Sequence, residues 1–273
     1  MLMAALEPVP ATAAPGPAAA MVLRIPCFSD HRERFYLRLL SASLAAIHQP
    51  ARIDCVNDLP GRRMWALMGE DQLDLIWGMQ TPDKDRLLLP IEVDLTDGLA
   101  GQRILLIRPQ SQRLFDRVTS IDSLRALNMV AGFGEGWFDA AVWKANRLQL
   151  VEFPGQFALM FPMVASGARG IDYLPRGGNE IVAEAAAHNS LVIEQHLLFY
   201  YERDMRFYLS PRAARHRPVL ESALRAAEAS GLKRRLIEQA FGADIKALDL
   251  AHRRRIRLAS PPQEAARRPQ LPR

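Results

Sequence analysis

The stretch VLRIPCF at residues 22–28, with ERFYLRLLSASLAAI at 33–47 and ARIDCV at 51–56, decides the class of the fold. The first and third stretches are short apolar runs of strand length, and the second places Phe35 and Leu39 on one helical face. Strand-like runs that alternate with helical segments predict an α/β fold with mainly parallel strands.

The same alternation continues along the chain. Further strands are expected in the apolar runs at 73–78, 102–108, 128–132, 148–153 and 206–210. Further helices are expected at 60–70, 120–127, 137–147, 178–189 and 218–241, the last of them divided at Gly231. A chain of 273 residues has room for one large domain or for two lobes of roughly 100 to 150 residues each.

Composition and charge exclude several classes of protein. Hydrophobic residues make up 49% of the chain and charged residues 24%, which is typical of a globular protein. The net charge is +5, but residues 252–273 hold seven arginines and one glutamate, so the rest is near neutral and argues against a nucleic-acid-binding face. No stretch approaches the ~18 apolar residues of a membrane span. Four prolines predict a disordered basic tail at 261–273.

The N-terminus and the two cysteines each leave two interpretations open. Residues 1–21 are rich in Ala and Pro, and Ala18–Ala20 resembles a signal-peptidase site, but the basic and apolar parts of a signal peptide are missing. The segment is therefore a signal-peptide remnant or a flexible leader. Cys27 and Cys55 lie in apolar runs without metal-ligand spacing, which favours two buried free thiols over a disulfide between neighbouring strand ends.

A glycine-rich turn, GFGEGW at 132–137, precedes one of the expected helices. Trp137 stands where a dinucleotide-binding turn needs glycine, so no nicotinamide or flavin cofactor is expected. The backbone N–H groups of such a turn can hold a carboxylate or phosphate, and ordinary turn chemistry is the alternative. The histidines are scattered, and no nucleotide-hydrolysing or hydrolase motif occurs, so no metal or other cofactor is expected.

Two loops carry candidate binding residues. In DLIWGMQTPDKDR at 74–86, a strand runs into a polar loop with Thr81 and Arg86, and a guanidinium at a strand's carboxyl end can grip a carboxylate, although a surface ion pair is the alternative. In ARGIDYLPRGGNE at 168–180, Arg176 precedes a helix that begins near Glu180. Glu180 and Glu184 share one helix face, which we interpret as a solvated acidic face rather than a catalytic pair.

Together these segments resemble the type 2 periplasmic solute-binding proteins of amino-acid ABC importers, within a poorly characterised bacterial branch of transporter substrate-binding domain proteins. The resemblance covers residues 22 to 260 or so. It is carried by LRIP at 23–26, FYLRLL at 35–40, the 74–86 segment, GEGWFDAAVWKANRL at 134–148, IDYLPRGGNEI at 171–181, Gly231 and Phe241-Gly242. It implies a periplasmic binding protein-like II fold: two lobes, each a mainly parallel sheet flanked by helices, joined by two crossover segments and closing on a ligand.

The resemblance also implies domain boundaries and a site. Lobe 1 would comprise 22–100 plus 211–260, and lobe 2 would comprise 101–210. In relatives an arginine clamps the ligand carboxylate with help from a hydroxyl; the matching residues are Arg86 and Thr81, on the segment that contains Gly78. Relatives hold the ligand ammonium with an acid where this chain has Arg176, so a free amino acid fits this pattern poorly.

Arg86 and Arg176 on opposite lobes favour a dianionic or otherwise acidic small molecule, with Trp137 as an aromatic wall and Asp139 beside it. We therefore expect a monomeric, non-catalytic periplasmic protein that captures a small polar, anionic or carboxylate-bearing solute for an ABC importer or a sensor. One alternative is a dehydratase-like enzyme in which Asp139 or Glu180 acts as general acid or base. Another is an interaction module that has lost its ligand site.

Overall fold

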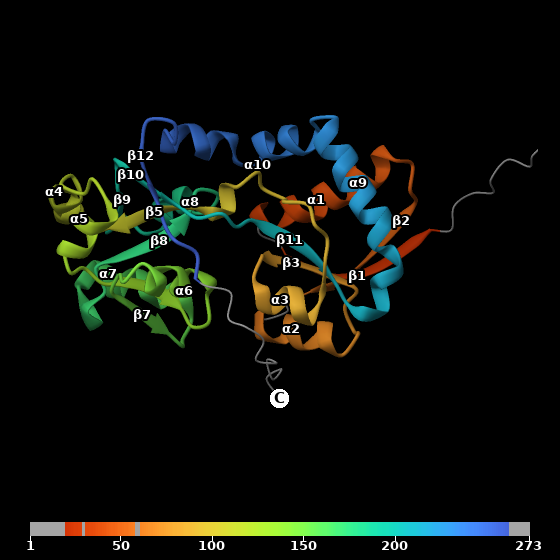
Figure 1. Cartoon of the computed structure of the whole chain (residues 1–273), viewed down its shortest axis with the longest axis horizontal. Coiled ribbons are helices and arrows are strands. Elements are labelled where there is room, and N and C mark those ends of the chain that lie inside the picture. The colour runs from red at the N-terminus through yellow and green to blue at the C-terminus, as the bar shows by residue number, and fades with distance from the viewer. Residues whose placement is uncertain (1–19, 29–30, 58–60, 262–273) are drawn as a thin grey trace, which may run out of the picture.

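The computed structural model describes residues 20–28, 31–57 and 61–261, which form two α/β lobes side by side (Figure 1). Apart from residues 20, 21 and 261, the expected leader and basic tail lie outside this range. Met21, placed in the leader by the sequence, is the first residue of a strand. No helix in the described ranges has the length and hydropathy needed to cross a membrane.

Lobe 1 combines two small sheets with helices. Its strands are β1 (Met21–Cys27), β2 (Ala51–Asn57), β3 (Leu75–Met79), β4 (Leu89–Pro90) and β11 (Met205–Leu209). Its helices are α1 (His31–Ala46), α2 (Gly61–Gly69), α3 (Pro82–Leu87) and α9 (Arg217–Ala229). β1 and β2 are parallel as expected, whereas β11 lies antiparallel between β3 and β4. Leu39 and Leu40 are fully buried against the strands, because α1 directs its apolar face inward.

Lobe 2 is built on one mixed sheet, in the order β12-β10-β5-β8-β6-β7, with β9 beside β5. Its strands are β5 (Gln102–Ile107), β6 (Ala131–Gly134), β7 (Leu150–Phe153), β8 (Tyr173–Gly177), β9 (Val192–Ile193), β10 (Leu197–Tyr200) and β12 (Arg254–Arg257). Its helices are α4 (Gln112–Phe115), α5 (Ile121–Ala126), α6 (Phe138–Ala145), α7 (Met160–Ser166) and α8 (Ile181–Ala187). The expected parallel pairing holds for β6 with β7 and β8, while β5 is antiparallel to its neighbours.

Two crossover segments join the lobes: residues 91–101 after β4 and residues 201–204 between β10 and β11. They are packed closely, because a Cβ atom at Gly101 would lie 2.5 Å from the carbonyl oxygens of Tyr201 and Arg203. The Asp204 carboxylate accepts hydrogen bonds from the Thr96 hydroxyl and from the backbone N–H of Gly98. The two crossovers therefore form one connected seam.

Two elements lie in the lobe opposite to the one expected. β11 belongs to the sheet of lobe 1, so the second crossover ends near 204 rather than near 210. β12 pairs in parallel with β10, so the chain returns to lobe 2 after α10 (Leu232–Leu248). We call α10 and β12 together the strap. Neither position follows from local sequence, because each strand is defined by the sheet that pairs with it.

The strap is a third connection between the lobes. α10 runs along one side of the molecule from α9 toward β12 (Figure 1). Ile237 and Phe241, in its first half and at its middle, pack in the core of lobe 1, and Leu248 at its end packs in the core of lobe 2. The two crossovers that the resemblance implied are present, and in the described residues the strap adds a further connection.

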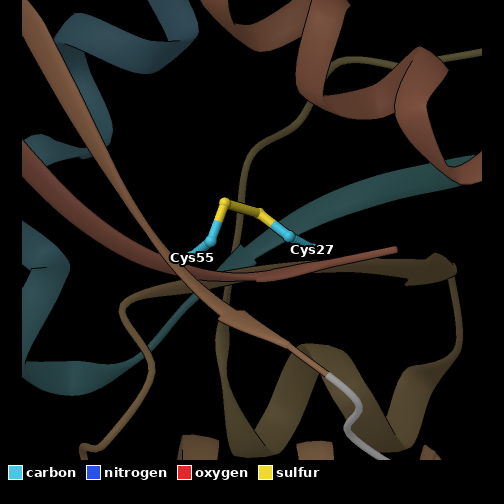
Figure 2. The surroundings of a disulfide bond; sticks show 2 residues. All are labelled: Cys27 and Cys55. Carbon is cyan, nitrogen blue, oxygen red and sulfur yellow. A yellow bond between two sulfur atoms is a disulfide. The ribbon is translucent and has the colours of Figure 1, made fainter. Parts of the chain in front are cut away.

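Cys27 and Cys55 form a disulfide between β1 and β2, with Cα atoms 5.3 Å apart (Figure 2). The expectation of two free thiols is therefore wrong. Cys55 lies opposite Ile25 in the parallel register, so Cys27 is only two residues further along the neighbouring strand. The register is a tertiary property, which is why sequence alone left both states of the thiols open.

Candidate binding cleft

A cavity of about 1160 Å³ lies between the lobes and is lined by side chains of both. Lobe 1 contributes Tyr36 from α1, Trp65 from α2 and the start of α3. Lobe 2 contributes the turn before α6, including Trp137, and the turn before α8, including Glu180. The first crossover contributes Ala100. Four of the six predicted site residues line this cavity, namely Thr81, Arg86, Trp137 and Asp139.

The start of α3 decides which cation points into the cavity. The Thr81 hydroxyl caps the helix by accepting a hydrogen bond from the Lys84 backbone N–H, and Pro82 follows at the first helical position. Arg86 lines the cavity but pairs with Asp83, which also lines it. The Thr81 hydroxyl oxygen thus accepts a hydrogen bond in the helix cap while its O–H can still donate to a ligand, and Arg86 already has a carboxylate partner.

Lys84, which the sequence analysis missed, is the more deeply placed cation of α3. Its Nζ donates to the Met79 carbonyl over 2.8 Å and lies 4.8 Å from the Trp65 ring centroid. Burial lowers the pKa of Lys84 to about 8, although Asp85 and Asp139 oppose that shift. Lys84 makes no ion pair with any described carboxylate.

Helical spacing separates the two cations of α3 but does not say which of them points inward. Residues two apart in a helix lie about 200° apart around its axis, so Lys84 and Arg86 cannot face the cavity equally. Gly78, predicted as a site residue, lies behind this cation: a Cβ atom there would be 3.3 Å from the Lys84 Nζ and 3.2 Å from the Trp65 ring. Gly78 does not line the cavity, but its missing side chain leaves space for both groups.

Asp139 lines the cavity at the start of α6 and is tied to the crossover seam. It accepts hydrogen bonds from the Arg103 Nε, over 2.5 Å, and from the Tyr201 hydroxyl. Arg103 also donates to the carbonyl oxygens of Ala100 and Gln102. Burial by itself would raise the pKa of Asp139, but Arg103 and Tyr201 hold it below its usual value. Asp139 is therefore an ionised, structurally occupied carboxylate.

Arg176 lies behind the cavity wall rather than on it. Its guanidinium donates two hydrogen bonds of 2.6 Å to Glu184 and pairs with Glu180 over 2.9 Å. It also packs against two aromatic rings that contact each other, 4.4 Å from the centroid of Phe157 and 5.1 Å from that of Trp137. With its residue only 6% exposed, Arg176 supports the aromatic wall and holds Glu180, and it would have to leave two carboxylates to reach a ligand.

The glycine-rich turn uses its own backbone donors. The N–H groups of Glu135, Gly136 and Trp137 donate to the Phe153 carbonyl, the Glu152 carboxylate and the Gly134 carbonyl respectively. Of the two interpretations left open for this turn, ordinary turn chemistry thus accounts for these three donors. The turn contributes the ring of Trp137 to the cavity. This ring packs so closely on Gly134 that a Cβ atom at that position would clash with it.

The cleft also contains Arg203, on the second crossover, which no sequence signal distinguished. Lining charges of both signs are present, and most carboxylates have cationic partners: Asp83 with Arg86, Asp139 with Arg103, Glu152 with Lys144 and Glu180 with Arg176. In the ranges that the structure describes, no group of three His, Cys, Asp or Glu side chains is arranged to hold a metal ion.

Solved structures with the same architecture were found by comparison of the fold, while no protein-family model and no curated protein matches the chain. A mutant of ArgBP from T. maritima is 18% identical, with 82% of this chain and 95% of that chain covered and a TM-score of 0.55. The amino-acid ABC transporter substrate-binding protein AbpA of Streptococcus pneumoniae, bound to L-arginine, is 14% identical over 83% and 96% of the chains, with a TM-score of 0.57.

A third solved structure is the ancestral amino-acid-binding protein AncCDT-1, a precursor of cyclohexadienyl dehydratase. It is 15% identical, with 81% of this chain and 95% of that chain covered and a TM-score of 0.56. Identities this low show the fold and leave the ligand undetermined. The match covers nearly the whole length of these solved structures, so the protein has the two-lobed fold of the type 2 periplasmic solute-binding proteins.

Proposed function

We propose that this protein is a non-catalytic solute-binding protein that acts outside the cytoplasm, as a monomer, and captures a small polar solute bearing a carboxylate. The solute would be passed to an ABC importer or detected by a membrane sensor. The observation that carries the proposal is the cleft of about 1160 Å³ with Lys84 pointing into it and no described carboxylate paired with that ammonium. A ligand carboxylate would complete the surroundings of this charge.

The fold and the disulfide support this proposal independently. Solved structures of the same fold include substrate-binding proteins of amino-acid ABC transporters. Disulfides such as Cys27–Cys55 persist mainly in oxidising compartments, including the bacterial periplasm. The open cleft also argues against an interaction module whose site is filled by its own side chains.

An enzyme of the dehydratase type is the second candidate, since one neighbour is a precursor of such an enzyme. A general acid in the cleft would need a carboxyl group with a raised pKa. The pKa of Asp139 is lowered instead. Burial raises the pKa of Asp204, but that residue binds the crossovers together and does not line the cavity. The charges of the cleft therefore favour binding over catalysis.

Native mass spectrometry of freshly purified protein tests the proposal directly, because a retained small molecule appears as an added mass. We expect an acidic, polar compound, and we expect Lys84→Gln to weaken its binding by at least about tenfold. Arg86→Gln is the matched control on the same helix, and it should change binding less because Arg86 already pairs with Asp83. A retained solute without an acidic group, or equal effects of both variants, would contradict the proposal.

A further inference from the structure

Arg203 occupies an unusual place for a cleft arginine, because it lies on a crossover rather than on either lobe. The segment from Tyr201 to Asp204 passes between β10 of lobe 2 and β11 of lobe 1. Its backbone is fixed there: the Tyr201 N–H donates to the Gly101 carbonyl, and the Asp204 carbonyl accepts from the Gln80 N–H. The Arg203 side chain therefore extends into the cleft from a fixed position between the lobes.

The guanidinium of Arg203 has unused hydrogen-bonding capacity. Its Nε is enclosed by protein and has no partner, and its Nη1 donates only to the Glu202 carbonyl, over 3.2 Å. Its Cζ lies 5.9 Å from the Phe138 ring centroid. In the described part of the chain it makes no ion pair, whereas Arg86, Arg103 and Arg176 each bind a carboxylate. An arginine offers five N–H donors, and because the Nε is enclosed, the donors left for a ligand on Arg203 are those of its two Nη atoms.

Strand pairing brings Arg203 and Lys84 to the same part of the cleft. Lys84 Nζ donates a hydrogen bond to the carbonyl of Met79. Met79 lies directly opposite Met205 in the antiparallel pairing of β3 and β11. Arg203 is two residues before Met205, a span of about 7 Å in extended chain. These two cations, which have no carboxylate partner among the described residues, thus lie near one end of the β3–β11 pair and line one cavity.

We infer that the cleft selects a solute with two acidic groups, of the dicarboxylate type, in which Lys84 binds one group and Arg203 binds the other. This inference rests on the proposed function and names its ligand class. Arg86 and Arg176 suggested an acidic ligand from sequence, and the structure instead leaves these two other cations available. A solute that lacks the second acidic group leaves the guanidinium without a counterion, and unpaired polar groups of this kind give strong discrimination.

Matched pairs of probes test this selectivity, because an amide replaces one carboxylate with little change in size. Binding of succinate, succinamate, glutarate and glutaramate would be measured by titration calorimetry with the full chain. We expect the better diacid to bind at least about tenfold more tightly than its monoamide. Arg203→Gln should remove that preference while changing monoamide affinity little, and Arg203→Lys should retain part of it.

Arg254→Gln is the control variant, because Arg254 is an exposed arginine on β12, and circular dichroism would verify that every variant is folded. Equal affinity of the wild-type protein for diacid and monoamide would overturn the inference. It would also be overturned if Arg203→Gln weakened diacid binding and monoamide binding by the same factor. If Lys84→Gln still abolishes monoamide binding in either case, the proposed carboxylate-binding function stands. If no probe binds, the two-acid inference fails, and the mass retained by the purified protein decides the proposed function separately.

Discussion

Asp139 shows how a single cleft residue can be committed to structure rather than to a ligand. Asp139 is 8% exposed, and its carboxylate neutralises the guanidinium of Arg103, which is 6% exposed. Tyr201 adds a hydrogen bond from the second crossover. This triad joins α6 to both crossovers, so its loss should disturb the seam between the lobes before it disturbs ligand contacts.

We predict that Asp139→Ala lowers the free energy of unfolding by about 3 to 5 kcal/mol, because it leaves the Arg103 guanidinium buried without a counterion. Tyr201→Phe removes only one hydrogen bond to a charged group and should cost roughly 1.5 to 3 kcal/mol. Urea unfolding followed by circular dichroism measures both variants. A smaller loss for Asp139→Ala than for Tyr201→Phe would contradict the assignment of Asp139 as the counterion.

Lys84 predicts how ligand binding depends on pH. In the free protein burial lowers its pKa to about 8, so the ammonium is charged below that pH and loses its proton above it. A bound carboxylate stabilises the charged form and raises the pKa, so affinity should be constant below pH 8 and then fall by up to about tenfold per pH unit.

In Lys84→Arg this dependence should disappear, because a guanidinium stays charged throughout that range. Calorimetric titrations from neutral to mildly alkaline pH measure the profile in both proteins. The interpretation of Lys84 as the anchor fails if the wild-type profile is flat, or if the Lys84→Arg profile falls in the same way.

At the scale of elements, the disulfide joins two strands that are paired only with each other. β1 and β2 form their own two-stranded sheet, and Cys27 and Cys55 close a loop with a sequence separation of 28 residues that includes α1. Helix α1 supplies Glu33 and Tyr36 to the cavity. The bridge therefore stabilises the part of lobe 1 that carries one wall of the cleft.

Reduction of the disulfide should destabilise the protein by about 3.5 kcal/mol, from the loop-closure entropy expected for a loop of this length. Thermal unfolding with and without dithiothreitol measures the difference. A double variant, Cys27→Ser with Cys55→Ser, should unfold at the lower temperature in both conditions. If dithiothreitol shifts the double variant as much as the wild-type protein, the bridge is not the cause.

Some elements carry too little local signal to be predicted. In β12 only Ile256 is buried, and the three arginines around it are exposed, so the segment looks like a charged tail until it pairs with β10. The run at 128–132 predicted a strand slightly too early, because Asn128 has φ +52° and β6 begins at Ala131. The division of the C-terminal helices at Gly231 was predicted correctly, since that residue has φ +70°.

At the scale of the whole molecule, the strap limits how the lobes move. Arg253, between α10 and β12, holds the end of the strap against lobe 2. Its guanidinium donates to the carbonyls of Leu248, Glu194 and Leu197, and it lies 3.6 Å from the fully buried Glu194 carboxylate. Lobe closure must therefore bend or shift α10 as well as rotate the two crossovers. Such a third connection favours a cleft that is largely formed before the ligand binds.

We predict that Arg253→Ala broadens the distribution of distances between the lobes. Spin labels would be attached to cysteines introduced at two exposed positions, by Ala45→Cys in lobe 1 and Arg117→Cys in lobe 2. Pulsed dipolar spectroscopy then measures the distance between the two labels. The wild-type strap should give a narrow distribution. Arg254→Ala is the matched control, because its side chain is exposed and should leave the distribution unchanged. Equal widths in all three proteins would show that the strap does not restrain the lobes.

The sequence by itself determined the α/β class and most helices, because the periodicity of apolar residues reflects which face of each element is buried. It also identified the segment at 74–86, which forms β3 and most of α3, and the turn at 132–137 as parts of the two walls. Tertiary structure alone decided that Lys84 rather than Arg86 points inward with no carboxylate partner among the described residues, and that Arg203 joins it. It also decided the disulfide and the strap, since strand register and the pairing of distant elements depend on contacts that no local pattern encodes.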